Sequence, residues 1–131
     1  MQQELAYIAL LVDDYDEAIA FYTKKLSFTL VEDTTLSESK RWVLIRPPGS
    51  KGCCLLLAKA ANETQSKSVG NQTGGRVFLF LYTDDIARDY KMMRENSINF
   101  TKEPVNESWG TVAVFSDLYG NLWDLIQPIN K

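Results

Sequence analysis

The sequence contains no histidine. Histidine is the commonest metal ligand and the commonest general base near neutral pH, so its absence weighs against metal-dependent and acid–base catalysis. The only two cysteines, Cys53 and Cys54, are adjacent and lack Cys-x-x-Cys spacing. A disulfide between neighbours would be strained, and this spacing is not typical of a zinc or redox site. We therefore expect both cysteines to pack as small apolar residues.

Long hydrophobic runs and an excess of positive charge are also missing. No apolar run approaches the roughly 18 residues that a membrane-spanning helix needs. Residues 1–4 lack the pattern of a signal peptide, so we expect a cytoplasmic protein with no membrane partner. The formal net charge of −3 gives no basic surface for nucleic acid. The length of 131 residues and hydrophobic content of 45% suit a single globular domain with its own core.

Two stretches of the chain have the same predicted order of elements. Asp14 and Asp85, 71 residues apart, each precede an apolar-striped helix and are suited to cap it. A strand is expected before each helix, at 4–12 and 76–83, and this offset matches Tyr7 with Phe78. Three further strands are expected in each repeat, at 28–36, 40–46 and 53–58, and at 98–102, 109–116 and 122–127.

The repeated order predicts an α+β protein of two βαβββ units. Repeat one spans about residues 4–60 and repeat two about 76–129, within one domain of residues 1–131. The stretch between them, residues 61–75, is polar and contains three glycines, so we expect a loop or linker there.

The end of the chain has a distinctive pattern, Asp117-x-x-Gly120-Asn121-x-x-Asp124-Leu125, which predicts a tight turn followed by a strand. It resembles the closing strand of the vicinal oxygen chelate superfamily, which includes glyoxalase I, extradiol dioxygenases and the bleomycin and fosfomycin resistance proteins. The run over residues 7–22 resembles the opening strand and helix of the same family. The resemblance covers nearly the whole chain and implies a curved, cup-shaped sheet, the glyoxalase/bleomycin resistance/dioxygenase fold. It also implies a homodimer, because the cup of this family is often built from two chains.

The resemblance further implies four positions at which family members hold a divalent metal ion in the cup. Here these positions carry Tyr7, Phe78, Leu55 or a neighbour within residues 54–56, and Asp124. One carboxylate does not hold a catalytic metal, since zinc sites use three protein ligands or more. Tyr7 would have to bind as a phenolate, which its ordinary pKa of about 10 disfavours. We therefore expect no metal and no other cofactor.

The remaining side chains predict a ligand-binding cup. Alternation along a strand places Tyr7, Ala9 and Leu11 on one face of the first strand. It likewise places Phe78, Phe80 and Tyr82 on one face of the equivalent strand. Aromatic rings stack on planar molecules, and arginine pairs with carboxylate or phosphate. The predicted ligand-binding residues are Tyr7, Arg41, Trp42, Phe78, Phe80, Trp109 and Asp124, with Arg46 as a further candidate. The alternative for the aromatic residues is a role in the core or in a dimer contact.

Two aspartates near the end of the chain have different expected roles. Asp124 lies within a predicted strand, where it can accept hydrogen bonds from a ligand, be satisfied by the protein itself, or act as a weak catalytic candidate if burial raises its pKa. Asp117 is expected to accept from backbone N–H groups of the turn at Gly120. Trp123 and Leu125 should face the helix and belong to the core.

Three functions are compatible with these residues. The first is a glyoxalase/bleomycin-resistance-like protein with a degenerate metal site, which binds or sequesters a small aromatic or anionic molecule. The second is a metal-dependent enzyme with atypical ligands, either a glyoxalase-like lyase, an isomerase or a dioxygenase-like enzyme. The third is a structural or regulatory dimer whose cup is filled with side chains. The absence of histidine favours the first over the second.

Overall fold

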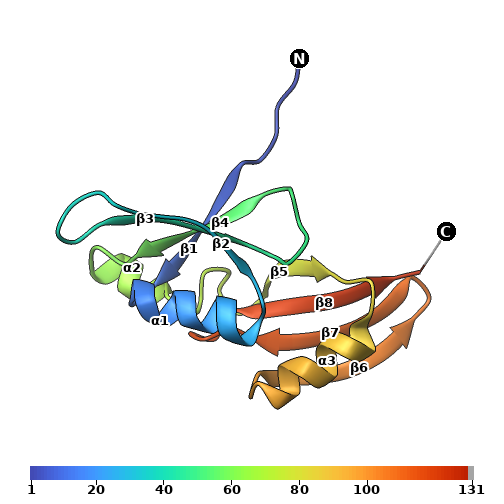
Figure 1. Ribbon diagram of the computed structural model, residues 1–131. Helices are drawn as coiled ribbons and strands as arrows, with labels where there is room; N and C mark the ends of the chain where they lie inside the picture. The colour runs from blue at the N-terminus through green and yellow to red at the C-terminus, as the bar shows by residue number, and fades with distance from the viewer. Residues whose placement is uncertain (130–131) are drawn as a thin grey trace. The chain divides into compact units, whose positions relative to one another are not determined.

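The computed structural model describes residues 1–129 and divides into two compact units, Met1–Val69 and the segment that begins at Gly70. Each unit contains one four-stranded mixed sheet and a helix that follows its first strand (Figure 1). The predicted α+β class and the two βαβββ repeats are confirmed.

The first unit forms a sheet with the strand order β1-β4-β3-β2. Its elements are β1 (Tyr7–Val12), α1 (Tyr15–Ala20), η1 (Phe21–Lys25, one turn of π-helix), β2 (Thr29–Thr35), β3 (Arg41–Arg46), β4 (Cys54–Lys59) and α2 (Glu63–Ser68). β1 runs parallel to β4, and the other neighbours are antiparallel. Asp14 begins α1 as predicted, because its carboxylate accepts a hydrogen bond from the Glu17 backbone N–H at 2.8 Å.

Alternate residues of the first sheet form the core under α1. Leu10 on β1, Ile45 on β3 and Leu57 on β4 are buried on this side of the sheet. Ala18 and Tyr22 supply the matching apolar stripe from α1 and η1, and both are buried as their helical spacing predicts.

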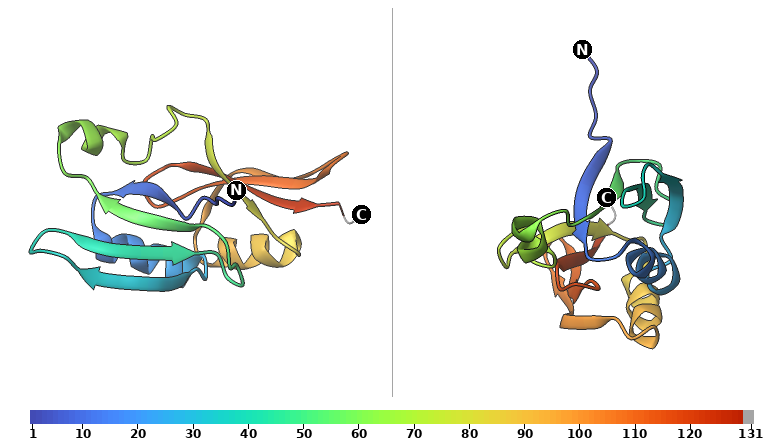
Figure 2. Two further views of the ribbon diagram at one scale, coloured as in Figure 1. Left: turned by 90° about the horizontal axis from the view of Figure 1, so that it is seen from above. Right: turned by 90° about the vertical axis from the view of Figure 1, so that its left-hand side faces the viewer.

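The second unit repeats this topology with the strand order β5-β8-β7-β6 (Figure 2). Its elements are β5 (Val77–Tyr82), α3 (Ile86–Glu95), β6 (Asn99–Glu107), β7 (Gly110–Ser116) and β8 (Leu122–Pro128). β5 runs parallel to β8, as β1 does to β4. A continuous series of ring contacts packs α3 against the sheet and runs through Tyr90, Phe100, Phe115 and Trp123. Trp123 and Leu125 are buried in this core, as predicted.

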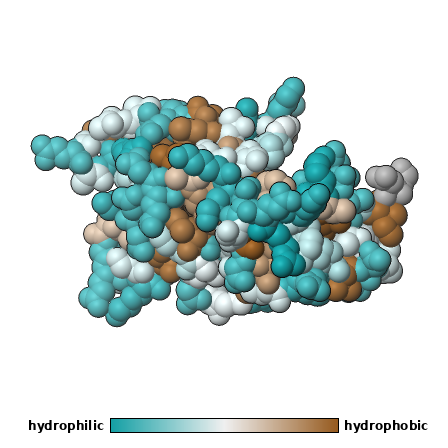
Figure 3. Space-filling view, turned by 60° about the horizontal axis from the view of Figure 1, so that its bottom comes forward, coloured by the Kyte–Doolittle hydropathy of each residue, from teal (hydrophilic) through white to brown (hydrophobic). Residues whose placement is uncertain are grey.

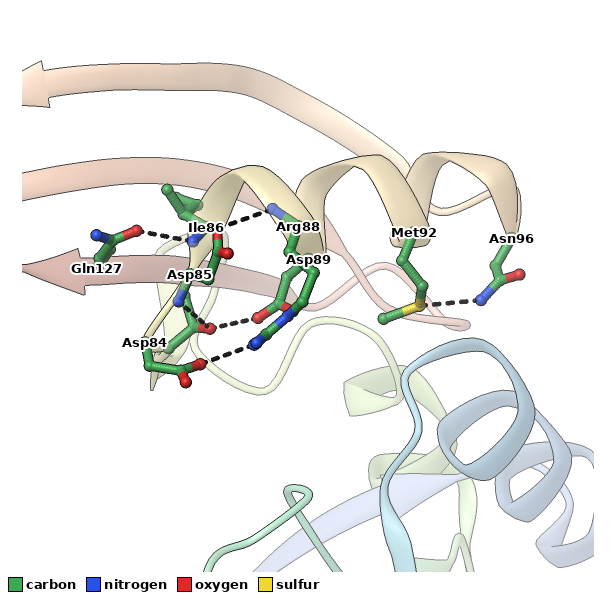
Figure 4. A network of polar contacts seen from close by, with 9 residues as sticks. Asp84, Asp85, Ile86, Arg88, Asp89, Met92, Asn96 and Gln127 are labelled. Atoms are coloured by element: carbon green, nitrogen blue, oxygen red, sulfur yellow. Dashed lines mark hydrogen bonds and ion pairs between the residues drawn. The ribbon is translucent and has the colours of Figure 1, made fainter.

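A network of polar side chains fixes the start of α3 (Figure 4). The Asp85 carboxylate caps the helix by accepting from the Arg88 backbone N–H at 3.0 Å. The Arg88 guanidinium donates to Asp84 at 2.7 Å and to Asp89 at 2.9 Å. Gln127 joins the helix to β8, because its Oε1 accepts from the Ile86 backbone N–H at 2.8 Å. These groups therefore hold α3 against its sheet.

Two local predictions differ from the structure. Residues 61–75 are not a loop throughout, because Asn62 caps the short helix α2 by accepting from the Gln65 backbone N–H at 2.9 Å. The strand expected to end before Pro104 continues to Glu107 as β6. Pro104 is tolerated because β6 is an edge strand and its register shifts between Lys102 and Val105, where a missing N–H costs no ladder bond.

The surface of the described residues is mostly polar on the side drawn in Figure 3, where hydrophobic residues form small groups between hydrophilic ones. None of the helices within residues 1–129 combines the length and the apolar character needed to cross a membrane.

Candidate ligand-binding surface

Each sheet has one face covered by α1 or α3 and an opposite face, which we call the helix-free face. Residues paired directly across neighbouring strands point to the same side of a sheet, so the register identifies the members of each face. A set of residues paired in this way across the strands is called a row below.

On the first sheet, the helix-free face carries two aromatic rings. Tyr7 on β1 is 49% exposed, and its ring contacts Trp42 of β3 edge-to-face with 5.7 Å between ring centroids. The register pairs Tyr7 with Cys54, whereas Trp42 lies beyond the row of Ala9 and Leu56. The two rings therefore reach toward each other over that row, where the small side chain of Ala9 leaves room for them.

On the second sheet, the helix-free face combines exposed aromatic rings with a carboxylate. One row joins Phe80 on β5 to Asp124 on β8, Val114 on β7 and Lys102 on β6. The next row begins at Tyr82 on β5. Phe80 is 65% exposed and Tyr82 is 70% exposed, so both rings are accessible along the β5 edge of this unit.

Asp124 is the only charged side chain in the strands Val77–Tyr82, Gly110–Ser116 and Leu122–Pro128. Its half-buried position raises the pKa of the Asp124 carboxyl, and the positive charge of Lys102 partly opposes this. The backbone of Lys102 lies two strands away, or about 10 Å at the usual strand spacing. Among residues 1–129, no ion pair joins the two side chains, so Lys102 offsets the charge of Asp124 only in part.

The sheet register identifies the counterpart of Asp124 in the first unit, which the resemblance places at Leu55 or a neighbour within residues 54–56. Ala9 and Phe80 are equivalent at the 71-residue offset. Leu56 pairs with Ala9, and Asp124 pairs with Phe80. Leu56 is therefore the counterpart of Asp124 in the first unit.

The four side chains at the metal-ligand positions do not fit a divalent cation. Leu56 and Phe78 have no donor atom, and Tyr7 and Asp124 offer one phenol and one carboxylate. Zinc sites use three or more oxygen, nitrogen or sulfur donors from the protein, and Ca²⁺ takes six to eight oxygen ligands. Within residues 1–129, no three histidine, cysteine, aspartate or glutamate side chains come together in a group that could supply them.

The predicted site residues do not all lie on the helix-free faces. Phe78 is half-buried at the irregularity of β5 between Val77 and Leu79, in the same strand as Phe80. Trp109 is 52% exposed in the turn between β6 and β7, outside the strands.

Arg41 points to the other side of its sheet, toward α1. Its guanidinium donates to Asp33 at 2.7 and 3.1 Å and to Asp16 of α1 at 2.8 Å, and it lies over the Tyr15 ring. These two carboxylates raise the pKa of Arg41 above its usual value. Because adjacent residues of a strand face opposite ways, Arg41 and Trp42 cannot share one face, and only Trp42 lies on the helix-free face.

Asp117 positions the turn that precedes β8, and the predicted role of its carboxylate is confirmed. One oxygen accepts from the backbone N–H groups of Tyr119, Gly120 and Asn121 at 3.0–3.2 Å. The other accepts from Asn121 Nδ2 at 3.2 Å and from Trp123 Nε1 at 3.1 Å. These bonds fix the start of β8 and so the place of Asp124 in its row.

A shallow hollow of about 440 Å³ lies at the end of β5 and β8, lined by Tyr82, Thr83, Asp84, Gln127 and Pro128. Its polar groups already have partners, since Thr83 bonds Asp89, Asp84 pairs with Arg88, and Gln127 accepts from α3. The hollow therefore offers a ligand mainly the ring of Tyr82.

Sequence reasoning missed Lys102 and Val114 as members of the row of Asp124. Alternation from Gly110 would have placed Val114. β6 shifts its register between Phe100 and Lys102 and again between Lys102 and Val105, so alternation counted from Phe100 places Lys102 on the wrong face.

The fold is thus a pair of βαβββ units whose helix-free faces carry aromatic side chains. A family model described as Glyoxalase/Bleomycin resistance protein/Dioxygenase superfamily matches residues 4–125. The chain belongs to this superfamily.

Three similar proteins cover almost the whole chain. A protein of Shewanella frigidimarina (strain NCIMB 400) is 58% identical over 132 residues, which cover 100% of this chain and 98% of that protein. The crystal structure of UcmS2 is 30% identical, with a TM-score of 0.84, and covers 96% of this chain and 98% of UcmS2. The crystal structure of TnmS3, described as an antibiotic binding protein from Streptomyces sp. CB03234, is 28% identical, with a TM-score of 0.80 and 98% of each chain covered.

Proposed function

We propose that this protein binds a small planar molecule without a metal ion, against the aromatic side chains of its helix-free faces. The observation that carries the proposal is the surface of the second sheet, where exposed Phe80 and Tyr82 lie beside the half-buried Asp124. Aromatic rings of this kind bury much area against a flat ligand, and one polar group can orient it. The similarity to TnmS3, which is an antibiotic binding protein, supports binding as the function.

The side chains at the four positions where family members hold a metal ion favour binding or sequestration over catalysis. Glyoxalase and dioxygenase chemistry requires a metal ion as Lewis acid or redox centre. Here two of the four equivalent positions are Leu56 and Phe78, which cannot ligate an ion. We therefore propose that the site works without a cofactor and that Asp124 contacts the ligand directly.

Binding is tested by titrating the protein with planar antibiotics, phenolic acids and quinones while tryptophan fluorescence is recorded. We expect at least one class to bind and quench the emission. Phe80→Ala should weaken binding by about 1–3 kcal/mol, the scale of one buried aromatic contact. Leu36→Ala is the matched control, because Leu36 is also an exposed apolar residue but lies at the β2–β3 turn. Failure of every class to bind would refute the proposal.

The metal-free site is tested by elemental analysis of the purified protein. We expect well under one equivalent of zinc, nickel, manganese or iron. A tightly bound stoichiometric metal that is lost in Asp124→Ala would instead favour a metal-dependent enzyme.

We also propose that the protein is a homodimer, since closed two-fold dimers are the commonest soluble assembly and the family often completes its site across two chains. Sedimentation velocity should show a dimer, and a protein that stays monomeric at high micromolar concentration would contradict this.

A further inference from the structure

The geometry points to a ligand class: we infer that the second sheet binds a planar molecule whose edge carries a hydrogen-bond donor or a positive charge, and that Asp124 selects it over anionic analogues. This inference rests on the proposed function and narrows it, since the sequence alone was compatible with an anionic ligand.

The first step is the position of the carboxylate relative to the exposed ring. Phe80 and Asp124 are directly paired on neighbouring strands, so their Cβ atoms lie about 5 Å apart on one face. A flat molecule that stacks on the Phe80 ring extends several ångström beyond it. Its edge therefore lies over the Asp124 carboxylate, within hydrogen-bonding reach.

The second step is the lack of a strong competing partner. Within residues 1–129, burial raises the pKa of Asp124, and the charge of Lys102, which forms no ion pair with it, lowers this pKa only in part. A donor on the ligand at about 3 Å would form the direct hydrogen bond that Lys102 does not, and the Coulomb energy between charges grows as their distance falls. A ligand cation or donor therefore satisfies Asp124 better than the protein does.

The third step concerns the positive charge that an anionic ligand would need. The guanidinium of Arg41 is held by Asp16 and Asp33 on the α1 side of the first sheet. On the second sheet, β5, β7 and β8 contribute Asp124 as their one charged side chain, and the cation of the same row, Lys102 on β6, lies three strands from Phe80. An anion placed over Phe80 would lie next to this carboxylate and be repelled.

The test uses three planar probes of equal ring size: 9-aminoacridine, which is a cation with N–H donors at neutral pH, acridine, which is neutral, and acridine-9-carboxylate, which is an anion. Dissociation constants are measured by calorimetry for the full-length protein. We expect 9-aminoacridine to bind more tightly than acridine, and acridine more tightly than the carboxylate.

Asp124→Asn removes the charge with little change in shape. It should weaken 9-aminoacridine binding about 10- to 100-fold, the scale of a charged hydrogen bond, and should strengthen binding of the carboxylate. Glu103→Gln is the matched control, because it removes one negative charge from β6 on the α3 side, next to Tyr90 and Arg94. It should leave all three constants within twofold of wild type.

The outcomes separate the inference from the proposed function. If the three probes bind but Asp124→Asn leaves their dissociation constants unchanged, or if the carboxylate binds most tightly to wild type, the inference is wrong and planar-ligand binding stands. If none of the probes binds and the wider panel also fails, both are wrong. Circular dichroism of Asp124→Asn confirms that the variant is folded before its constants are compared.

Discussion

Replacement of Asp117 by asparagine tests whether its carboxylate organises the start of β8. The side chain is 6% exposed and accepts five hydrogen bonds. Asparagine is almost the same size, so the substitution opens no cavity. Its amide oxygen can still accept from the three backbone N–H groups, but its NH₂ group then faces Asn121 Nδ2 and Trp123 Nε1. These two groups are also donors, and their residues are buried.

The expected loss of stability follows from those two bonds. A buried donor left without an acceptor costs about 1–3 kcal/mol. Some relief comes from rotation of the Asn121 amide, but this rotation removes the 3.2 Å bond that Asn121 Oδ1 accepts from the Gln72 backbone N–H. We therefore expect Asp117→Asn to lower the free energy of unfolding by about 2–4 kcal/mol. For a chain of this length, the melting temperature should fall by roughly 6–15 °C.

Urea unfolding followed by circular dichroism measures this loss. The control is Glu107→Gln, which also removes one negative charge from an exposed carboxylate of the same unit, lies outside the α3 network, and should leave the unfolding midpoint nearly unchanged. A loss below about 1 kcal/mol for Asp117→Asn would show that the turn does not depend on the carboxylate, and would refute the argument from unsatisfied donors.

Three further predictions concern single positions. Gly70→Ala should destabilise the fold far more than Gly74→Ala in urea unfolding. Both positions have positive φ, at which an alanine costs about 1 kcal/mol. A Cβ at Gly70 would also lie 1.9 Å from the Tyr119 carbonyl oxygen, whereas Gly74 has open space. Asp124→Asn should raise the free energy of unfolding at pH 7, because burial raises the pKa of Asp124 and so disfavours its charged form. This gain in stability should shrink as the pH falls and vanish below about 3.9, the ordinary pKa of aspartate. A gain in stability that persists at pH 3 would contradict burial as the cause. Arg41→Gln should cost about 0.5–1 kcal/mol of stability through its lost ion pairs, yet leave 9-aminoacridine affinity within twofold, and a larger affinity change would place Arg41 in the site.

The repeat architecture could be predicted because its signals are local. Asp14 and Asp85 cap their helices through their own side chains, and each is followed by apolar residues at helical spacing. Asp117 and Gly120 mark a turn whose bonds are likewise close in sequence. Patterns of this kind do not depend on the rest of the chain, so the sequence carries them directly.

Features that depend on register could not be predicted in the same way. β6 looked interrupted because Pro104 usually ends a strand, and only its edge position makes the proline harmless. The membership of Lys102 in the row of Asp124 depends on the register shift between Phe100 and Lys102. The sequence predicts both Arg41 and Trp42 as ligand-binding residues, although neighbours in a strand face opposite sides. The ion pair of Arg41 with Asp16 could not be predicted either, because it joins two elements 25 residues apart.

Comparison of equivalent rows explains why the two repeats present different surfaces despite the same backbone. In the first sheet the row is Ala9, Leu56, Leu44 and Glu32, and in the second it is Phe80, Asp124, Val114 and Lys102. Small Ala9 leaves space for the rings on either side of its row to meet, whereas Phe80 fills that space with its own ring. The charged residue at the edge of the sheet is Glu32 in the first row and Lys102 in the second. Beside the opening strand, Leu56 of the first row is replaced by Asp124 in the second. The two sheets thus share one strand register, and in the second a stacking ring and a carboxylate are direct neighbours in one row.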